Sequence, residues 1–311
     1  MLALFADDTE ISFAHADLKV LTDTLTRDLI KLEKWLSHNR LILNAKKTNG
    51  MFISNGKRSN PSFNSIVVNL SGIPIPFVQT FRYLGVMIDD KLNFHQHVKK
   101  ICQQVTFKTN VLKKCAYLFD LQFKTILFKL FIQSQFYYCS TLLFHLNNKS
   151  DQEKLETLFS KSLNKFLNIK LYKSCTFLKN GKTKNKNLKL NLADQIKVLE
   201  SFELFPIKLR FFYHFLSFIH TNLKFASNFP LCSKILNQRN ISKIVRVLPF
   251  RFPLYSNYYK FSFTITTIKL LNLFLHNYLI LTKKDFSRKF KNVNYLLNYY
   301  NLFIKHLNSW S

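Results

Sequence analysis

Residues 2–13 read LALFADDTEISF, and this stretch decides how the first part of the chain is expected to fold. An apolar run leads into two adjacent aspartates, Asp7 and Asp8, and leaves through alternating Ile11 and Phe13. The pattern predicts two strands joined by a tight turn, with both carboxylates at the tip of the hairpin. Because neighbouring side chains on a strand point to opposite faces, one aspartate is expected to face a site while the other turns aside or supports it.

The aspartate pair has two interpretations. A carboxylate on an apolar hairpin is costly to bury unless a cation or a donor meets it, and this favours a site for a hard metal such as Mg²⁺. Asp-Asp-Thr is also ordinary turn chemistry, because aspartate bonds its own backbone in turns. The stretch alone favours the turn, and the motifs that follow it in the chain reverse that preference.

The composition points to an anionic partner. Lys and Arg together number 46 against 17 Asp and Glu, which gives a formal net charge of +29 over 311 residues. Nucleic acid is the first candidate for such a chain, although a bias toward Lys, Asn, Phe and Leu from an A/T-rich coding sequence explains the charge equally well. Five glycines and seven prolines argue against glycine-rich phosphate loops and long disordered linkers.

Cysteine usage and hydropathy predict an intracellular protein, nuclear or cytoplasmic, with no membrane partner. Five cysteines without CxxC spacing predict reduced thiols. Asp7 and Asp8 interrupt the first apolar run, so no signal peptide is expected. Residues 130–148 lack charged side chains, but their Gln, Ser, His and Asn residues favour a buried helix over a membrane span.

Local patterns predict the elements that follow the hairpin. Leucines at steps of three and four predict an amphipathic helix over residues 17–38. Two short strands, or one bent strand, are expected over residues 41–54 and a small hairpin over 66–77. Residues 81–88 read as one strand in which Gly85 permits a bulge or a close backbone approach.

The order of these motifs is specific. FADDT is followed by a leucine helix containing Trp35, by LILNAKKT at 41–48, by FRYLGV at 81–86, and by Leu92, Phe94 and His97. This order over residues 1–97 resembles the second half of the catalytic region of reverse transcriptases from non-LTR (LINE-type) retrotransposons. Phe94 departs from the family, in which a Trp is usual at that position.

The resemblance implies an RNA-directed DNA polymerase that uses Mg²⁺, with an RNA template and a DNA primer as partners. It implies that Asp7 and Asp8 form the catalytic metal-binding turn, with Asp7 the better ligand. Lys47 matches a lysine expected near the nucleotide phosphates, and Arg82 and Tyr83 lie in the hairpin expected to contact the primer. Residue-level alternatives stay open: a solvated Lys47, a sheet-surface role for Arg82 and Tyr83, and a zinc pair at His95 and His97 that lacks a third ligand nearby.

The predicted fold class is α+β, with a partial polymerase palm of antiparallel strands and a helix, followed by an all-α thumb-like and C-terminal region. The expected boundaries are 1–96 for the palm with its primer-grip hairpin and 97–178 for the helical thumb-like region. Residues 179–189 are expected to form a basic Lys/Asn loop, and 190–311 a helical region of uncertain role.

The resemblance also predicts an enzyme truncated at its N-terminus. Polymerisation uses two metal ions about 4 Å apart, and the family supplies another aspartate from an earlier palm strand. Since FADD begins four residues after Met1, that strand and the fingers are expected to be missing and the chain to be inactive alone. Two further alternatives stay open, namely a non-catalytic remnant that binds nucleic acid by charge and a decayed element product without a role.

Overall fold

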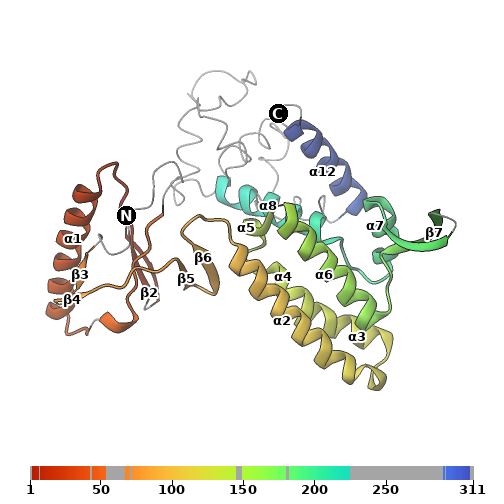
Figure 1. The fold of residues 1–311 in the computed structure, drawn as a ribbon, viewed down its shortest axis with the longest axis horizontal. Coiled ribbons are helices and arrows are strands. Elements are labelled where there is room, and N and C mark those ends of the chain that lie inside the picture. The colour runs from red at the N-terminus through yellow and green to blue at the C-terminus, as the bar shows by residue number, and fades with distance from the viewer. Residues whose placement is uncertain are drawn as a thin grey trace. The chain divides into compact units, whose positions relative to one another are not determined.

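The computed structural model describes residues 2–6, 8–42, 44–53, 67–70, 72–144, 149–179, 182–224, 290 and 292–308. The chain divides into two compact units, Met1–His97 and Val98–Ser311, and each is described here by itself (Figure 1). Asp7 lies outside the described residues. Within the described part, helices combine with small antiparallel strand pairs, which is compatible with an α+β class.

The first unit begins with the predicted hairpin. β1 (Leu2–Phe5) pairs antiparallel with β2 (Asp8–Ile11), and Phe5 lies opposite Asp8. Ala6 in the turn has a φ of 51°, in the left-handed region that non-glycine residues seldom adopt. Leu4 and Phe5 are 67% and 62% exposed, so this hairpin leaves apolar side chains uncovered within the described residues.

The leucine helix forms where the sequence predicts it. α1 (Leu18–His38) starts after Asp17, whose carboxylate accepts a hydrogen bond from the Lys19 backbone N–H at 2.8 Å and thereby caps the helix. The helix ends at Asn39, whose side chain donates to the Trp35 carbonyl. The leucine stripe is only half-buried and no residue of α1 is fully buried, although the helix packs against β3 (Asn69–Leu70).

The segment after α1 differs from the predicted strands. Its described residues form the short 3-10 helix η1 (Ala45–Lys47), because the Asn44 carbonyl and side-chain oxygen both accept from the Lys47 backbone N–H. Strand pairing is limited to one bridge between Gly50 and Phe77. A Cβ at Gly50 would lie 2.9 Å from the Phe77 ring, so a larger residue would displace this contact. The small hairpin predicted over 66–77 is present as β3 paired with β4 (Ile73–Pro74).

The single strand that the local pattern predicts over 81–88 is wrong, because these residues form a hairpin, which is the element that the family resemblance implies for FRYLGV. β5 (Thr80–Tyr83) pairs with β6 (Val86–Asp89) through a two-residue turn. Leu84 and Gly85 have φ values of 44° and 85°, which is the pair of positive values that a type I′ turn requires. Gly85 therefore permits a chain reversal, not a bulge.

A buried carboxylate organises the loop from β6 to α2 (His95–Lys114). Asp89 is 5% exposed and accepts hydrogen bonds from the backbone N–H groups of Lys91, Asn93 and Phe94 at 3.2, 3.0 and 2.7 Å. Leu92 and Phe94 have positive φ angles in this loop. Asp89 thus fixes the backbone that leads into α2.

The described residues of the second unit are mainly helical and have an aromatic core, but the predicted all-α region is wrong because β7 (Tyr172–Lys179) and β8 (Lys182–Lys189) lie within it. Phe159 contacts Phe128 and Phe136 edge-on, with ring centroids 5.9 and 5.6 Å apart. The buried helix predicted over residues 130–148 is divided, in its described residues, by a π-helical turn and by Cys139, which has a φ of 51°. The helical elements in its described residues are α2, η3 (Ala116–Leu118), α3 (Leu121–Leu127), η4 (Phe128–Gln133), α4 (Ser134–Tyr137), α5 (Ser140–Phe144), α6 (Lys149–Leu167), α7 (Leu192–Glu200), α8 (Ile207–Lys224) and α12 (Val293–Asn308).

The Lys/Asn stretch is not a loop in its described residues. β7 (Tyr172–Lys179) and β8 (Lys182–Lys189) form a regular antiparallel hairpin, in which Tyr172 lies opposite Lys189. The composition of the stretch predicts a solvated loop, but the preceding segment supplies a complete pairing partner. None of the helices in the described residues is long and apolar enough to cross a membrane.

Candidate functional site

The predicted metal-binding turn lies at the tip of the β1–β2 hairpin. Asp8 is the first residue of β2 and its side chain is exposed. Glu10 follows two residues later, so both carboxylates lie on the same face of the strand. Since Asp7 lies outside the described residues, Asp8 and Glu10 are the carboxylates that the structure places at this tip.

Tyr83 of β5 lies close to these carboxylates. Its hydroxyl lies within hydrogen-bonding reach of Glu10, and the charge of Asp8 acts on it as well. Desolvation is the main cause that raises the pKa of Tyr83 above its usual range, and the charges of Glu10 and then Asp8 raise it further. The structure therefore brings together Asp8 and Tyr83, two residues that the sequence places in separate motifs.

Glu10 is a site residue that the motif analysis misses. The FADD motif marks the adjacent pair Asp7 and Asp8. The alternation of side chains along the strand instead puts Asp8 and Glu10 on one face. The i, i+2 spacing of the two acids within an expected strand is the signal that would have found it.

The other predicted contact residues lie apart from this face. Lys47 is exposed in η1, and its backbone N–H bonds to Asn44. Arg82 is exposed and precedes Tyr83 on β5, so the two side chains point to opposite faces of the hairpin. Arg82 and Tyr83 are therefore not placed to contact one ligand from the same face.

The later acids and the histidine pair have structural contacts. Asp89 accepts the three backbone bonds of the loop before α2. His97 is buried, and its Nδ1 lies 3.5 Å from the Met87 backbone N–H. Within the described ranges, no three His, Cys, Asp or Glu side chains gather as a metal would require, at His95 and His97 or elsewhere.

The donor chemistry at the hairpin tip suits a hard cation. Mg²⁺ prefers oxygen ligands and binds through one or two carboxylates, completed by water and substrate phosphates. Asp8 and Glu10 are oxygen donors on one strand face, and Asp8 is open to solvent. The described residues thus fit one side of such a site, with Glu10 shared between a cation and the Tyr83 hydroxyl.

The second unit has a separate surface of exposed aromatic and basic residues. Phe107 on α2 is 69% exposed and Tyr117 on η3 is 84% exposed. Lys113 and Lys114 lie exposed at the end of α2, between these rings in the sequence. Exposed rings can stack on the bases of a single strand, and exposed ammonium groups can pair with its phosphates.

Comparisons with known proteins point to one kind of enzyme over part of the chain. The RNA-directed DNA polymerase from mobile element jockey of Drosophila melanogaster is 30% identical over 111 residues, 36% of this chain and 11% of the relative. The probable RNA-directed DNA polymerase from transposon X-element of the same species is 27% identical over 101 residues, 32% of this chain and 11% of the relative.

A third match covers a similar share. The jockey enzyme of Drosophila funebris is 26% identical over 113 residues, 36% of this chain and 12% of that relative. No family model matches the chain, and no solved structure matches it significantly. The matched segments span about a ninth of the curated relatives, so the similarity supports a reverse transcriptase-like region within this chain.

Proposed function

We propose that this chain is part of an RNA-directed DNA polymerase of the non-LTR retrotransposon type. The observation that carries the proposal is the convergence of Tyr83 with Asp8 and Glu10, because it joins the FADD hairpin to the FRYLGV hairpin. The partial similarity to jockey and X-element polymerases supports the same assignment. In this proposal residues 1–96 are a partial palm, and the helices after them are a thumb-like region.

The hairpin tip is the proposed metal site. Asp7 and Asp8 are the proposed ligands of Mg²⁺, and Glu10 supports the site from the same face as Asp8. When bound, the metal neutralises charge on the transferring phosphate and activates the attacking 3′-oxygen. Tyr83 holds the Glu10 carboxylate in place through its hydroxyl, since a hydrogen bond restricts the rotamers of both partners.

Template and primer are the proposed partners of the basic surfaces. Arg82 is exposed and can pair with a primer phosphate, a contact that positions a strand without reading its sequence. Lys47 is the proposed contact to nucleotide phosphates, from its exposed position in η1. Within the second unit, the exposed aromatic and lysine residues of α2 and η3 are a separate proposed nucleic-acid contact.

We expect the chain by itself to bind nucleic acid without extending a primer. Two-metal catalysis needs carboxylates that clamp both ions, and one hairpin tip does not provide them all. The proposal therefore includes a further segment, with a palm strand and fingers, that supplies another aspartate. β1 has one strand partner within the described residues, and its second edge is where such a strand can pair.

Primer extension tests the catalytic part of this proposal. The full chain is incubated with a primed RNA template, Mg²⁺ and deoxynucleotides, beside Asp7→Ala and the control Asp23→Ala on the exposed side of α1. We expect no extension by any of the three. Mg²⁺-dependent extension that disappears only in Asp7→Ala would refute the expected inactivity and would establish the metal ligand.

A second candidate function is nucleic-acid binding without catalysis, favoured by the exposed rings and lysines of α2 and η3. A binding competition between nucleic acid and heparin distinguishes the polymerase function from binding by charge alone. A polymerase-derived chain should prefer a primed RNA–DNA hybrid over heparin of equal charge, because the palm and thumb recognise shape as well as charge. Equal binding to both, with the same steep salt dependence, would favour the charge-only function.

A further inference from the structure

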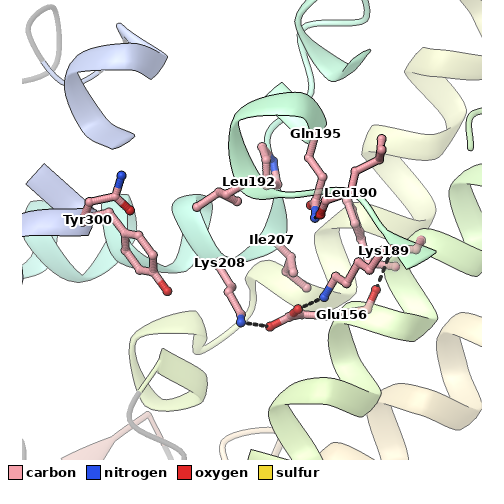
Figure 2. Close-up of a pocket in the computed structure, with 12 residues that line it drawn as sticks. Glu156, Lys189, Leu190, Leu192, Gln195, Ile207, Lys208 and Tyr300 are labelled. Carbon is pink, nitrogen blue, oxygen red and sulfur yellow. Dashed lines mark hydrogen bonds and ion pairs between the residues drawn. The ribbon is translucent and has the colours of Figure 1, made fainter. Parts of the chain in front are cut away.

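A pocket of about 360 Å³ lies in the second unit, among residues that belong to none of the motifs of the hairpin site. Side chains from α6, the end of β8, α7, α8 and α12 line it (Figure 2). The polar part includes Glu156, Lys189 and Lys208, and the apolar part includes Leu192 and Ile207. Its volume is near the lower end of the range of about 300–1,000 Å³ for small-molecule sites.

Three charged side chains form an ion network in this pocket. Glu156 is 7% exposed and is bound by the ammonium groups of both Lys189 and Lys208, the latter at 2.6 Å. Figure 2 shows the Glu156 carboxylate between the two ammonium groups. Among the ionisable groups that line the pocket, one carboxylate faces two lysines, and Glu153, which lies outside the lining, also acts on both lysines by its charge.

The ammonium groups of Lys189 and Lys208 are partly desolvated in the pocket. Burial lowers the pKa of both Lys189 and Lys208 below the usual range, and the charge of Glu153 opposes this for both. Both side chains nevertheless stay partly open, at 38% and 45% exposed. An ammonium group has three donors, and that of Lys208 forms an ion pair with Glu156 Oε1, an oxygen for which no hydrogen bond is described.

We propose that this pocket binds a small organic anion, whose single phosphate or carboxylate group pairs with Lys208 and whose apolar body lies against Leu192 and Ile207. The two ammonium groups in the lining select an anion, and the apolar wall selects a molecule with a hydrocarbon or aromatic part. The limited volume admits a small molecule and not a nucleic-acid strand. The inference is independent of the polymerase proposal, because it uses none of the residues of the hairpin site.

Tyr300 supplies a further donor on the other side of the pocket. Figure 2 shows Tyr300 and Lys189 on opposite sides, with Lys208 between them in this view. Burial raises the pKa of Tyr300, so its hydroxyl stays protonated near neutral pH and can donate to an anion. Gln195 donates its amide to the Leu190 carbonyl at 2.8 Å and thereby fixes the wall between β8 and α7.

Calorimetry on the full chain tests the proposal. The probes are phenyl phosphate, benzoate and inorganic phosphate at low ionic strength, where charge pairing is least screened. We expect saturable one-site binding of an aromatic anion, tighter than that of inorganic phosphate. Phenyl phosphate and benzoate distinguish a phosphate ligand from a carboxylate ligand.

Matched variants locate the binding. Lys208→Met keeps the length of the side chain, and it should weaken binding about tenfold or more, the usual value of a charge-assisted hydrogen bond. Lys197→Met is the control, because it removes the same charge from an exposed position of α7 that does not line the pocket. Leu192→Trp should weaken phenyl phosphate and leave inorganic phosphate unaffected.

Glu156→Gln should change the anion affinity in the opposite direction from Lys208→Met. The carboxylate competes with the ligand for both lysines, so its neutralisation should tighten anion binding several-fold. Circular dichroism checks each variant, and Leu192→Trp and Glu156→Gln carry the test if Lys208→Met does not fold. Absence of saturable binding, or equal weakening by Lys197→Met and Lys208→Met, would overturn the proposal and leave the ion network as a purely structural feature.

Discussion

Replacement of Asp89 by alanine should unfold the loop between β6 and α2. Asp89 stands in the FRYLGVMID stretch, next to Asp90, where an acidic residue invites a catalytic interpretation. Its carboxylate instead accepts three backbone N–H bonds, two at Oδ1 and one at Oδ2. Those bonds hold Leu92 and Phe94 at φ values of 52° and 58°, a conformation that costs L-residues about 1–2 kcal/mol each.

The size of the effect follows from what happens to the three donors. A buried donor that loses its partner costs about 1–3 kcal/mol. Lys91 and Asn93 are exposed and Phe94 is half-buried, so water replaces part of the lost bonding and the low end applies. We therefore expect Asp89→Ala to lower the free energy of unfolding by about 3 kcal/mol, and Asp89→Asn, which keeps one carbonyl acceptor, by roughly half of that.

Hydrogen exchange and urea denaturation measure this effect. Asp89→Ala should speed amide exchange in β5, β6 and the first turn of α2, and it should lower the urea midpoint. Asp90→Ala is the control, because no hydrogen bond to its side chain is described, and it should change stability by less than about 0.5 kcal/mol. An Asp89→Ala variant no less stable than Asp90→Ala would refute the reasoning.

Three further predictions use other parts of the structure. Nuclear magnetic resonance should find the pKa of Tyr83 above its usual value, and Glu10→Gln should lower that pKa. Because the pKa is raised in the folded state, the protonated Tyr83 contributes its stability below about pH 10, and this stability is lost as the pH rises through the folded pKa. Desolvation, followed by the charge of Arg210, lowers the pKa of His214 to about 4, so stability should fall as the pH drops from about 6.5 to 4, and less so in His214→Gln. Tyr117→Ala should weaken binding of single-stranded RNA by about 1–3 kcal/mol, and Lys113→Gln should reduce the salt slope by about 0.7, both in fluorescence anisotropy titrations.

Elements with local signals were predictable from the sequence. The Asp17 cap and the leucine spacing are contained within α1, so the predicted and observed helices nearly coincide. The β5–β6 turn has no local signal of this kind, because FRYLGVMI reads as one strand, and only the family resemblance implies a hairpin there. Leu84 has no intrinsic preference for positive φ, and it is the pairing of β5 with β6 that places it there.

Features that depend on partners far away in the chain have no local sequence signal, so the sequence does not predict them. The Lys/Asn composition of β8 resembles a loop, and the strand forms because β7 offers eight residues in register. The pocket joins Glu156, Lys189, Lys208 and Tyr300, which lie far apart in the chain and share no motif. The contact of Tyr83 with Glu10 likewise links two hairpins whose separate patterns give no sign of it.

The strand geometry also sharpens the question of which aspartate binds metal. The family resemblance favours Asp7, whereas alternation along β2 places Asp8 on the face that Glu10 and Tyr83 share. Mn²⁺ is a paramagnetic substitute for Mg²⁺ that broadens nearby backbone resonances in nuclear magnetic resonance spectra. This broadening at the hairpin distinguishes Asp7 from Asp8 as the metal ligand. If Asp7→Asn abolishes the broadening and Asp8→Asn and Glu10→Gln leave it intact, the metal lies at the turn. If Asp8→Asn and Glu10→Gln abolish it together, the metal lies on the strand face, and Asp7 has the supporting role.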